Sequence, residues 1–390
     1  MHIVDISALY SPTGGGIRTY TRHKLLAAQR VGHELTVIVP GAGDAVEHFG
    51  QNARLISIPS PRFPLDRSYF YFASNEAIHA ALDRHRPDFV EASSPWGSAT
   101  AVAEWPGSAP RALVMHADPL SAWAYRWLEG LVSHKMIDRG FDWFWRHLRR
   151  LDARMDIIVC ASPSLTTGMT DGGLRRAETI AMGVEPGIFS PQLRDPGLRA
   201  RLLDRCDLPE TATLALGVGR FSPEKRWPLV IAGATAASYS RPLGLLLVGD
   251  GHSRAAVMRA VGENPHVQLA AAINDRGEMA RLMASADLML HGGSAETFGM
   301  VQAEGRASGL PIVVPDEGGA GDQAVPGAAL RYASGDAASA AAMIGQAIDD
   351  LPAMRAAALR MAPGVRTMDT HFEDLFARYA QIADAARRAA

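Results

Sequence analysis

Short apolar runs alternate with longer stretches of helical periodicity along almost the whole chain of 390 residues. Gly, Pro or Asp bounds each run, as at the ends of buried strands, and stretches such as 18–31 and 74–85 carry apolar residues at helical spacing. This alternation is typical of a parallel sheet with helices on both faces. The first series of predicted strands comprises 2–8, 34–40, 53–58, 87–92, 111–116 and 157–161.

A Gly- and Pro-bearing segment, 182–191, interrupts the pattern before it restarts, which makes this segment the best candidate for a linker. The second series of predicted strands comprises 213–219, 243–249, 267–271, 288–291 and 312–315. We therefore predict two doubly wound α/β domains that face a central cleft, with ligand at the carboxyl ends of both sheets. The chain length agrees with two domains of ordinary size.

The two series also predict where the domains begin and end. A first Rossmann-like domain is expected over 1–185, a linker over 186–200 and a second Rossmann-like domain over 201–370. The Ala-rich tail, 371–390, predicts a last helix, and packing back on the first domain is one arrangement for it.

Composition excludes several classes of protein. The 39 Lys and Arg residues are balanced by 41 Asp and Glu residues, so the net charge of −2 gives no global basic field for binding nucleic acid. Only Cys160 and Cys206 occur, without metal-type spacing, which fits a reducing compartment. No run of about 18 apolar residues predicts a membrane span, and the amino terminus reads as a strand, so we expect a cytoplasmic protein.

A run of three glycines, Gly14, Gly15 and Gly16, follows the first predicted strand and precedes a predicted helix. Unhindered backbone N–H groups and the positive end of a helix can contact a phosphate there, so we expect Gly15 and Gly16 to bind it. The spacing departs from the dinucleotide motif G-x-G-x-x-G. A plain strand-to-helix turn is the alternative.

Two cations, Arg220 and Lys225, follow the first predicted strand of the second domain. At the carboxyl edge of a sheet they can neutralise a diphosphate and stabilise it as a leaving group without a metal. Surface cations on a solvated loop are the alternative.

Two acids, Glu296 and Glu304, lie eight residues apart where a predicted strand leads into a helix. On a helix that separation is ~12 Å, comparable to the distance between the two sugars of a nucleotide sugar. Glu296 can accept from the donor sugar and Glu304 from the ribose, while the N–H groups of Phe298, Gly299 and Met300 face phosphate or sugar. An ordinary capped helix with solvated acids is the alternative.

His116 and Asp118 lie just past a predicted strand of the first domain. A histidine at such an edge can hydrogen-bond a donor hydroxyl or an acceptor, and Asp118 can orient it. A structural histidine is the alternative.

The segment 135–154 interleaves basic and aromatic residues, with six Lys or Arg against three Asp. Such a mixture can attach a cytosolic protein to anionic lipid headgroups at the inner face of a membrane, where a lipid-linked acceptor would lie. A half-buried core helix that leads into the strand predicted at 157–161 is the alternative.

Taken together, these residues resemble the retaining GT-B glycosyltransferases of family 4, which are glycogen-synthase-like and mannosyltransferase-like. Ordered motifs at suitable spacing are more specific than any single motif. The matching parts are Gly14-Gly15-Gly16, 32–37, His116, 183–191, 218–220 with Lys225, 248–251, Glu296-x7-Glu304, 308–311 and Gly318-Gly319.

The resemblance implies an acceptor-side first domain and a second domain that binds the nucleotide sugar. By the resemblance, Arg220 and Lys225 match the residues that bind the diphosphate. Glu304 matches the residue that holds the ribose, and Glu296 the one that contacts the donor sugar. His116 matches the first-domain histidine beside the reacting centre. The implied reaction moves a hexose from a UDP- or GDP-sugar to a hydroxyl of a lipid, glycan or small molecule. The anomeric configuration is retained, with no cofactor and no obligatory metal; same-face attack is favoured, and a covalent intermediate stays open.

Two positions depart from the family pattern. Gly305-Arg306 replaces a small-apolar pair, and a glycine inside a helix costs up to ~1 kcal/mol relative to alanine. Asp322 stands where a glutamate commonly follows the Gly-Gly pair.

Three other functions fit the sequence less well than glycosyl transfer. A nucleotide-sugar epimerase of this fold would need further acids around the sugar, and a phosphorylase would need a pyridoxal phosphate lysine. A non-catalytic nucleotide-sugar-binding protein would have lost charge at the four motif positions. Arg220, Lys225, Glu296 and Glu304 are all intact, which favours an active enzyme.

Overall fold

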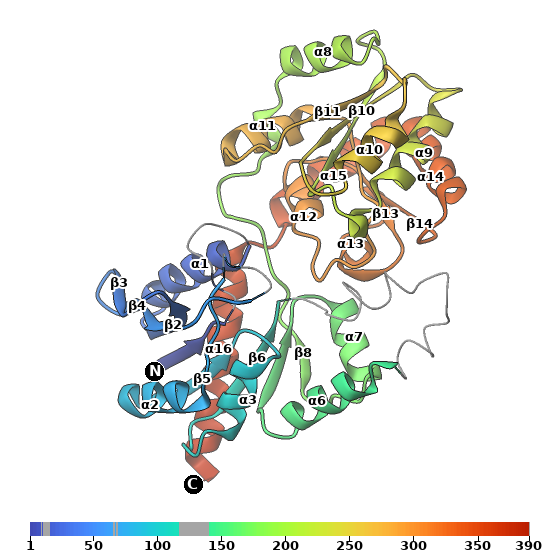
Figure 1. Ribbon diagram of the computed structural model, residues 1–390. Helices are drawn as coiled ribbons and strands as arrows, with labels where there is room; N and C mark the ends of the chain where they lie inside the picture. Colours follow the sequence, from blue (N-terminus) through green and yellow to red (C-terminus); the bar gives the residue numbers. More distant parts are fainter. Residues whose placement is uncertain (9, 11–15, 65–66, 68, 117–139, 390) are drawn as a thin grey trace. The chain divides into compact units, whose positions relative to one another are not determined.

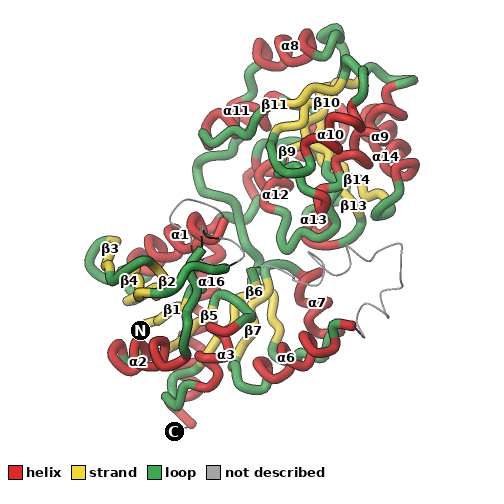
Figure 2. The backbone as a smooth tube through the Cα atoms, viewed as in Figure 1, coloured by secondary structure: helices red, strands yellow, loops and turns green. Residues whose placement is uncertain are grey.

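Two sheets, each flanked by helices, organise the chain (Figures 1 and 2). The computed structural model describes residues 1–390 except 9, 11–15, 65–66, 68, 117–139 and 390. The first sheet belongs to unit 1, which holds the described residues of 1–181 together with 368–390, and the second belongs to unit 2, which holds 182–367. The chain thus leaves unit 1 after Ala181 and returns to it after Thr367.

Unit 1 contains an eight-stranded sheet in the order β3-β4-β2-β1-β5-β6-β7-β8, parallel except for the β3–β4 pair. Its strands are β1 (His2–Ile6), β2 (Glu34–Gly41), β3 (Ala45–Phe49), β4 (Ala53–Pro59), β5 (Phe89–Ala92), β6 (Arg111–Met115), β7 (Ile157–Cys160) and β8 (Ala177–Thr179). Its helices are α1 (Gly16–Arg30), α2 (Asn75–His85), α3 (Gly97–Glu104), α6 (Asp142–Asp152), α7 (Pro163–Asp171) and α16 (Met368–Ala389). Strands β5 and β7 are buried along their whole length, as strands covered on both faces are.

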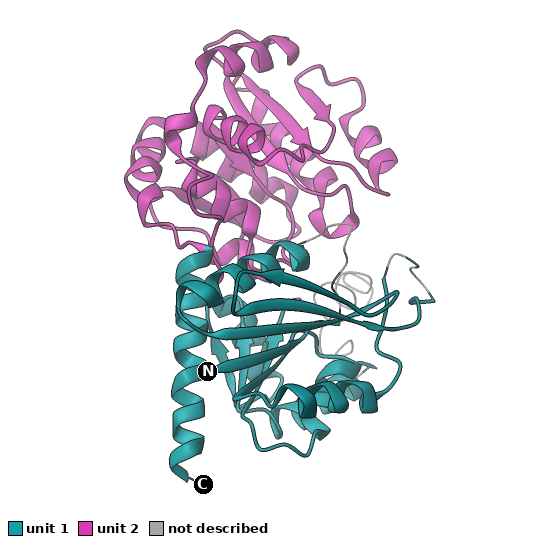
Figure 3. Cartoon of the chain, turned by 90° about the vertical axis from the view of Figure 1, so that its left-hand side faces the viewer, with its two compact units in different colours: residues 1–118, 128–181, 368–390 teal, residues 119–127, 182–367 magenta. Residues whose placement is uncertain are grey.

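The last helix, α16, packs in unit 1 although it follows unit 2 in sequence (Figure 3). The ring of Tyr379 stacks on Phe89 of β5 with ring centroids 4.2 Å apart, and Phe372 lies 5.0 Å from Tyr20 of α1. Both Tyr379 and Phe372 are fully buried. The core of unit 1 therefore includes side chains from the end of the chain.

Unit 2 contains a six-stranded, all-parallel sheet in the order β11-β10-β9-β12-β13-β14. Its strands are β9 (Thr213–Val218), β10 (Leu243–Val248), β11 (Val267–Ala270), β12 (Leu288–Leu290), β13 (Ile312–Pro315) and β14 (Ala329–Tyr332). Its helices are η2 (Pro191–Leu193), α8 (Pro196–Arg205), η3 (Pro223–Lys225), α9 (Trp227–Ser238), α10 (Arg254–Val261), α11 (Arg276–Ser285), α12 (Met300–Ala307), α13 (Gly318–Asp322), α14 (Ala337–Asp349), α15 (Leu351–Met361) and η4 (Ala362–Gly364).

Both sheets reverse their strand order at one point, which confirms the prediction of two doubly wound α/β folds. In unit 2 the reversal lies between β9 and β12, and in unit 1 it lies between β1 and β5. A doubly wound sheet binds its ligand outside the carboxyl ends of the strands at such a switch point. The loops that follow β9 and β12 are therefore the place to look for a site in unit 2.

Candidate active site

Glycines let the loops after β9 and β12 approach each other closely at the switch point of unit 2. A Cβ on Gly292 would lie 2.7 Å from the carbonyl oxygen of Lys225, and one on Gly293 would lie 2.8 Å from that of Glu224. Real Cβ atoms do not approach backbone so closely, so larger residues would push the loops apart. The two loops can therefore present side chains to a common site.

Lys225 and Glu296 form an ion pair at this point, with the ammonium Nζ donating to Oε1 of the carboxylate. Nε2 of the buried His291 lies 3.0 Å from the same oxygen. Burial opposes ionisation of Glu296, but the charge of Lys225 and the contact with His291 hold its pKa well below the usual range. Glu296 is therefore an anion at neutral pH and can only accept hydrogen bonds.

Burial lowers the pKa of His291, although Glu296 partly offsets that effect. The imidazole is therefore neutral at physiological pH, and its Nε2 proton is the one that can face the carboxylate. Sequence reasoning placed His291 only at the end of a strand; its pairing with Glu296 depends on the loop between them.

Glu304 lies in α12 with 5% of its surface exposed, and its Oε1 accepts from Nη2 of Arg276 at 2.5 Å. Arg276 also contacts Glu185 at 3.3 Å, and its guanidinium lies 4.8 Å from the ring centroid of Phe189. Burial raises the pKa of Glu304, and Arg276 only partly offsets this. Oε2 of Glu304 accepts no hydrogen bond from the described residues, so it is available to a ligand hydroxyl.

The helix α12 begins at Met300, so of the two motif acids only Glu304 is helical. The helical spacing of ~12 Å therefore does not apply to Glu296, which lies in the preceding loop. That loop is held by α13: the N–H of Gly319 donates to the carbonyl oxygen of Glu296 at 2.7 Å. A Cβ on Gly318 would lie 2.0 Å from the carbonyl oxygen of Ser294, which explains the Gly-Gly pair.

The start of α12 offers backbone donors. Within the described part of the chain, the N–H groups of Phe298, Gly299 and Met300 donate to no acceptor, and no side chain caps the helix. Gly299 adopts φ = 83°, a left-handed conformation that a glycine takes without strain. Three N–H groups and the positive helix end are thus free to bind an anion.

The first of the two sequence departures has a structural explanation. A Cβ on Gly305 would lie 2.7 Å from Cε of Met289 in β12, so a glycine allows close packing there. The neighbouring Arg306 donates to Oε1 of Gln323 at 2.6 Å, and Gln323 in turn donates to the carbonyl oxygen of Phe298 at 3.0 Å. The pair Gly305-Arg306 therefore supports the loop that carries the motif.

Arg220 has an exposed side chain whose guanidinium makes no ion pair or hydrogen bond with the residues that the structure describes. Its backbone is fixed, because Nε1 of Trp227 donates to its carbonyl oxygen at 2.9 Å. An exposed guanidinium on a fixed backbone position can turn toward an incoming phosphate.

His116 lies in unit 1 at the end of β6, with its ring centroid 4.7 Å from that of Tyr20 in an edge-on contact. Burial lowers the pKa of His116 to about 4, so the ring is neutral at physiological pH. Gly16 is the first residue of α1, where a Cβ would meet nothing within 4 Å. Gly14, Gly15 and Asp118 lie outside the described residues. The roles predicted for these unit 1 residues stay predictions.

A buried charge cluster at the switch point of unit 1 has no counterpart among the sequence predictions. The fully buried Lys24 of α1 lies 3.0 Å from Asp5 of β1 and 2.5 Å from Glu91 of β5. Ser93 donates to both acids, at 2.8 Å and 3.1 Å, and Tyr379 of α16 donates to Glu91 at 2.8 Å. The sequence signal is faint: one acid interrupts each of two otherwise apolar strands.

In the described part of the chain, no helix is long and apolar enough to cross a bilayer, and no three His, Cys, Asp or Glu side chains gather as metal ligands would.

Comparison with known proteins identifies the class of protein. Its two sheets match those of glycosyltransferases with the GT-B fold, and its family matches make it a nucleotide-sugar-dependent glycosyltransferase. Residues 14–187 match Glycosyltransferase Family 4, and residues 202–360 match Glycosyl transferases group 1, so the chain belongs to family 4 of the retaining glycosyltransferases. The predictions of family, fold and activity are confirmed.

Relatives and solved structures agree with this assignment. The chain is 28% identical over 333 residues to a GDP-mannose-dependent alpha-mannosyltransferase of Mycobacterium tuberculosis, covering 84% of this chain and 82% of that protein. It is 28% identical over 323 residues to a GDP-mannose-dependent alpha-(1-6)-phosphatidylinositol dimannoside mannosyltransferase of the same species, covering 80% and 79%. Its fold is similar to that of sucrose-phosphate synthase from Thermosynechococcus elongatus, with a TM-score of 0.76, 17% identity and coverage of 99% and 100%.

Proposed function

We propose that this enzyme transfers mannose from GDP-mannose to a hydroxyl of a lipid-linked acceptor. The observation that carries the proposal is the pairing of Lys225 with Glu296 at the switch point, beside a helix start whose N–H groups are open. The relatives named above use GDP-mannose, and one of them acts on a phosphatidylinositol dimannoside, which supports this donor and this class of acceptor.

The diphosphate of the donor would be held by positive charge alone. Lys225 and Arg220 supply two cations, and the N–H groups at the start of α12 supply a third, partial positive charge. The negative charge that develops on the leaving diphosphate is then stabilised where it forms, which is the most effective use of fixed charge in catalysis. The ammonium group of Lys225 would contact both Glu296 and a phosphate oxygen, so the ion pair between Lys225 and Glu296 would persist when the donor binds.

The two acids would hold the hydroxyls on either side of the diphosphate. Glu296 is ionised and can accept from hydroxyls of the mannose, and Oε2 of Glu304 can accept from the ribose. We expect same-face attack: the acceptor oxygen bonds to the anomeric carbon as the bond to the diphosphate oxygen breaks. The acceptor proton passes to the leaving diphosphate.

The donor is tested by thermal unfolding in the presence of nucleotide sugars. GDP-mannose at 100 times its dissociation constant is expected to stabilise the enzyme by about 2.7 kcal/mol, because a ligand of the native state stabilises by mass action. UDP-glucose and ADP-glucose at equal concentration are expected to stabilise it far less. A larger shift with a UDP- or ADP-sugar than with GDP-mannose would contradict the choice of donor but not the enzyme class.

The sequence of the segment 135–154 indicates either a membrane-binding surface or a core helix. Its residues 135–139 lie outside the described residues, and the helix α6 in the rest of it has features of both. Its inner face is apolar, with Phe144, Leu148 and Leu151 buried, so it is a core helix. Its outer face carries Trp143, 52% exposed, beside a shallow hollow that three arginines also line. These are Arg146, Arg149 and Arg150.

We propose that this outer face contacts the anionic headgroups of the membrane that holds the acceptor. A basic residue near such a surface contributes about 1 kcal/mol, or about fivefold in binding. Arg150→Glu is therefore expected to reduce sedimentation with phosphatidylinositol-containing vesicles at low salt by more than fivefold. Arg259→Glu, an exposed arginine of α10 in unit 2, is the matched control. If the native enzyme does not sediment with these vesicles, only the core-helix role of α6 remains.

A further inference from the structure

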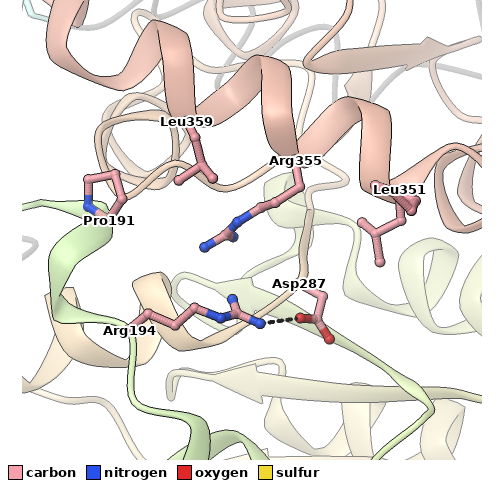
Figure 4. Close-up of a pocket in the computed structure, with 7 residues that line it drawn as sticks. Pro191, Arg194, Asp287, Leu351, Arg355 and Leu359 are labelled. Carbon is pink, nitrogen blue, oxygen red and sulfur yellow. Dashed lines mark hydrogen bonds and ion pairs between the residues drawn. The ribbon is translucent and has the colours of Figure 1, made fainter.

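Two arginines bind one buried carboxylate at the amino edge of the unit 2 sheet, the edge opposite to the one that carries Lys225 and Glu296. A third arginine extends toward the same place from α15 (Figure 4). The carboxylate is Asp287, which directly precedes β12 and accepts from the N–H of Leu214 in β9 at 2.9 Å. Because β9 and β12 run parallel, their amino ends lie on the same edge of the sheet. This cluster is therefore separate from the candidate active site.

Two of the arginines use up the acceptor capacity of Asp287. Nε of Arg199 lies 3.0 Å and 2.9 Å from the two carboxylate oxygens, and its Nη2 lies 2.7 Å from one of them. Nη2 of Arg194, which follows η2, donates at 2.8 Å. Asp287 is 7% exposed, and although burial opposes its ionisation, these bonds keep its pKa below the usual range. One negative charge is thus shared by two guanidinium groups.

The third arginine, Arg355 of α15, has no acid of its own. Within the described residues it forms no ion pair, and its two hydrogen bonds go to the carbonyl oxygens of Ala286 and Ala284, at 3.3 Å and 3.2 Å. Arg194 donates to the same two carbonyls at 2.9 Å and 3.2 Å. Burial, with the nearby charge of Arg194, lowers the pKa of Arg355 to about 10. The cluster holds three positive charges and one negative charge, an excess of two.

Capping of α11 explains only part of this arrangement. The two carbonyls lie at the end of that helix, where cations are favourable, and Arg194 alone already reaches both of them. A guanidinium has five N–H donors, and Arg355 uses two of them in long bonds. Figure 4 shows Arg355 and Arg194 extending toward the same space from opposite sides, with Asp287 beside Arg194.

That space is a hollow of about 480 Å³, within the range of small-molecule sites. Its remaining walls are apolar, formed by Pro191, Leu351, Pro352 and Leu359. Leu359 is 41% exposed, so the hollow is open to solvent at this side. A ligand could therefore enter with a charged group toward the arginines and a less polar body along the leucines.

We propose that this hollow is a second ligand site, which binds the phosphate group of a phosphorylated molecule between Arg355 and Arg194. Planar guanidinium groups match phosphate oxygens in pairs of parallel hydrogen bonds. A phosphate dianion also balances the excess of two positive charges. Since the site lies at the opposite edge of the sheet from Lys225, its occupant does not compete with the nucleotide sugar.

The test is calorimetric titration of the full-length enzyme with inorganic phosphate, at constant ionic strength in chloride. Arg355→Gln keeps N–H donors for the two carbonyls but removes the charge, and it is expected to weaken phosphate binding at least tenfold. Arg360→Ala removes an exposed arginine from the same helix and is expected to bind as the native enzyme does. Equal affinity in Arg355→Gln and the native enzyme would overturn the proposal.

Phosphate can also enter the candidate active site, so Lys225→Ala forms a third arm. Phosphate binding that persists in Lys225→Ala supports the second site, whereas binding that disappears there assigns the phosphate to the active site and overturns the proposal. Thermal unfolding of each variant verifies that it is folded.

Vesicles that contain phosphatidylinositol then identify the source of the phosphate. Sedimentation that falls in Arg355→Gln indicates a lipid headgroup, and unchanged sedimentation indicates a soluble phosphorylated molecule.

Discussion

Lys225→Ala is expected to lower kcat/KM for the sugar donor by about 10²- to 10³-fold, the cost of removing one charge-stabilising group from a transition state. Lys225 is the cation that pairs with Glu296, and its removal also leaves that carboxylate without its main stabilising charge. Glu304→Ala is expected to have an effect of similar size, because it removes the open acceptor oxygen of α12. Turnover of the donor, measured from release of the nucleoside diphosphate, gives kcat/KM.

The loss must come from chemistry and not from unfolding. Lys225 is the last residue of the short helix η3 and 17% of its side chain is exposed, so the fold should survive its truncation. Arg259→Ala, which removes an exposed arginine of α10, is the matched control and should leave turnover unchanged. Near-normal turnover in Lys225→Ala or in Glu304→Ala, with the thermal unfolding midpoint preserved, would reject the role given to that residue.

Lys24→Met is expected to reduce the free energy of unfolding by about 3–5 kcal/mol, the usual cost of removing one partner from a buried ion pair. Lys24 is fully buried between Asp5 and Glu91, so its loss leaves two carboxylates in the core without a counter-charge. Arg30→Met breaks an exposed ion pair between α1 and Asp369 instead, and it is expected to cost less than about 1 kcal/mol. Urea unfolding measures both.

The pH dependence of the Lys24→Met variant gives a second test. Burial already raises the pKa of Asp5 in the native protein, and the charge of Lys24 opposes this rise. Without Lys24, the pKa of Asp5 in the folded state rises further above its value in the unfolded state. The folded state then binds more protons than the unfolded state. Stability is then lost as the pH rises through the folded-state pKa. The destabilisation should therefore be larger at neutral than at mildly acidic pH; a loss that is independent of pH would contradict this account.

The sequence predicts the interior strands of both sheets but only one of the four edge strands, β11. Buried parallel strands are continuous apolar runs, and the segments predicted at 111–116 and 312–315 are indeed β6 and β13. The strands β3, β8 and β14 were not predicted, and all three lie at or near the edges of their sheets. β3 is exposed along most of its length and β8 has three residues, so neither carries an apolar pattern that could reveal it.

In the candidate site, the sequence predicts which residues take part but not which of them are in contact. The pairing of Lys225 with Glu296 joins residues 71 positions apart, and the contact of Arg276 with Glu304 joins two helices. The motif positions of the first pair could be read from the sequence, but their contact could not, because it depends on how closely the loops after β9 and β12 approach. Arg276 has no motif of its own: it becomes important only because α11 begins beside α12.

The return of α16 to unit 1 bears on the order in which the protein can fold on the ribosome. The described part of unit 2, residues 182–367, is one continuous stretch of sequence, so all of it has been synthesised before Tyr379 and Phe372 exist. The amino-terminal sheet, although translated first, must wait for those two aromatic side chains to close its interior and for the Tyr379 hydroxyl to reach Glu91. In newly made chains, unit 2 should therefore fold before unit 1, the reverse of their order of synthesis. A stop codon within the final twenty residues should leave unit 2 folded and prevent unit 1 from folding stably.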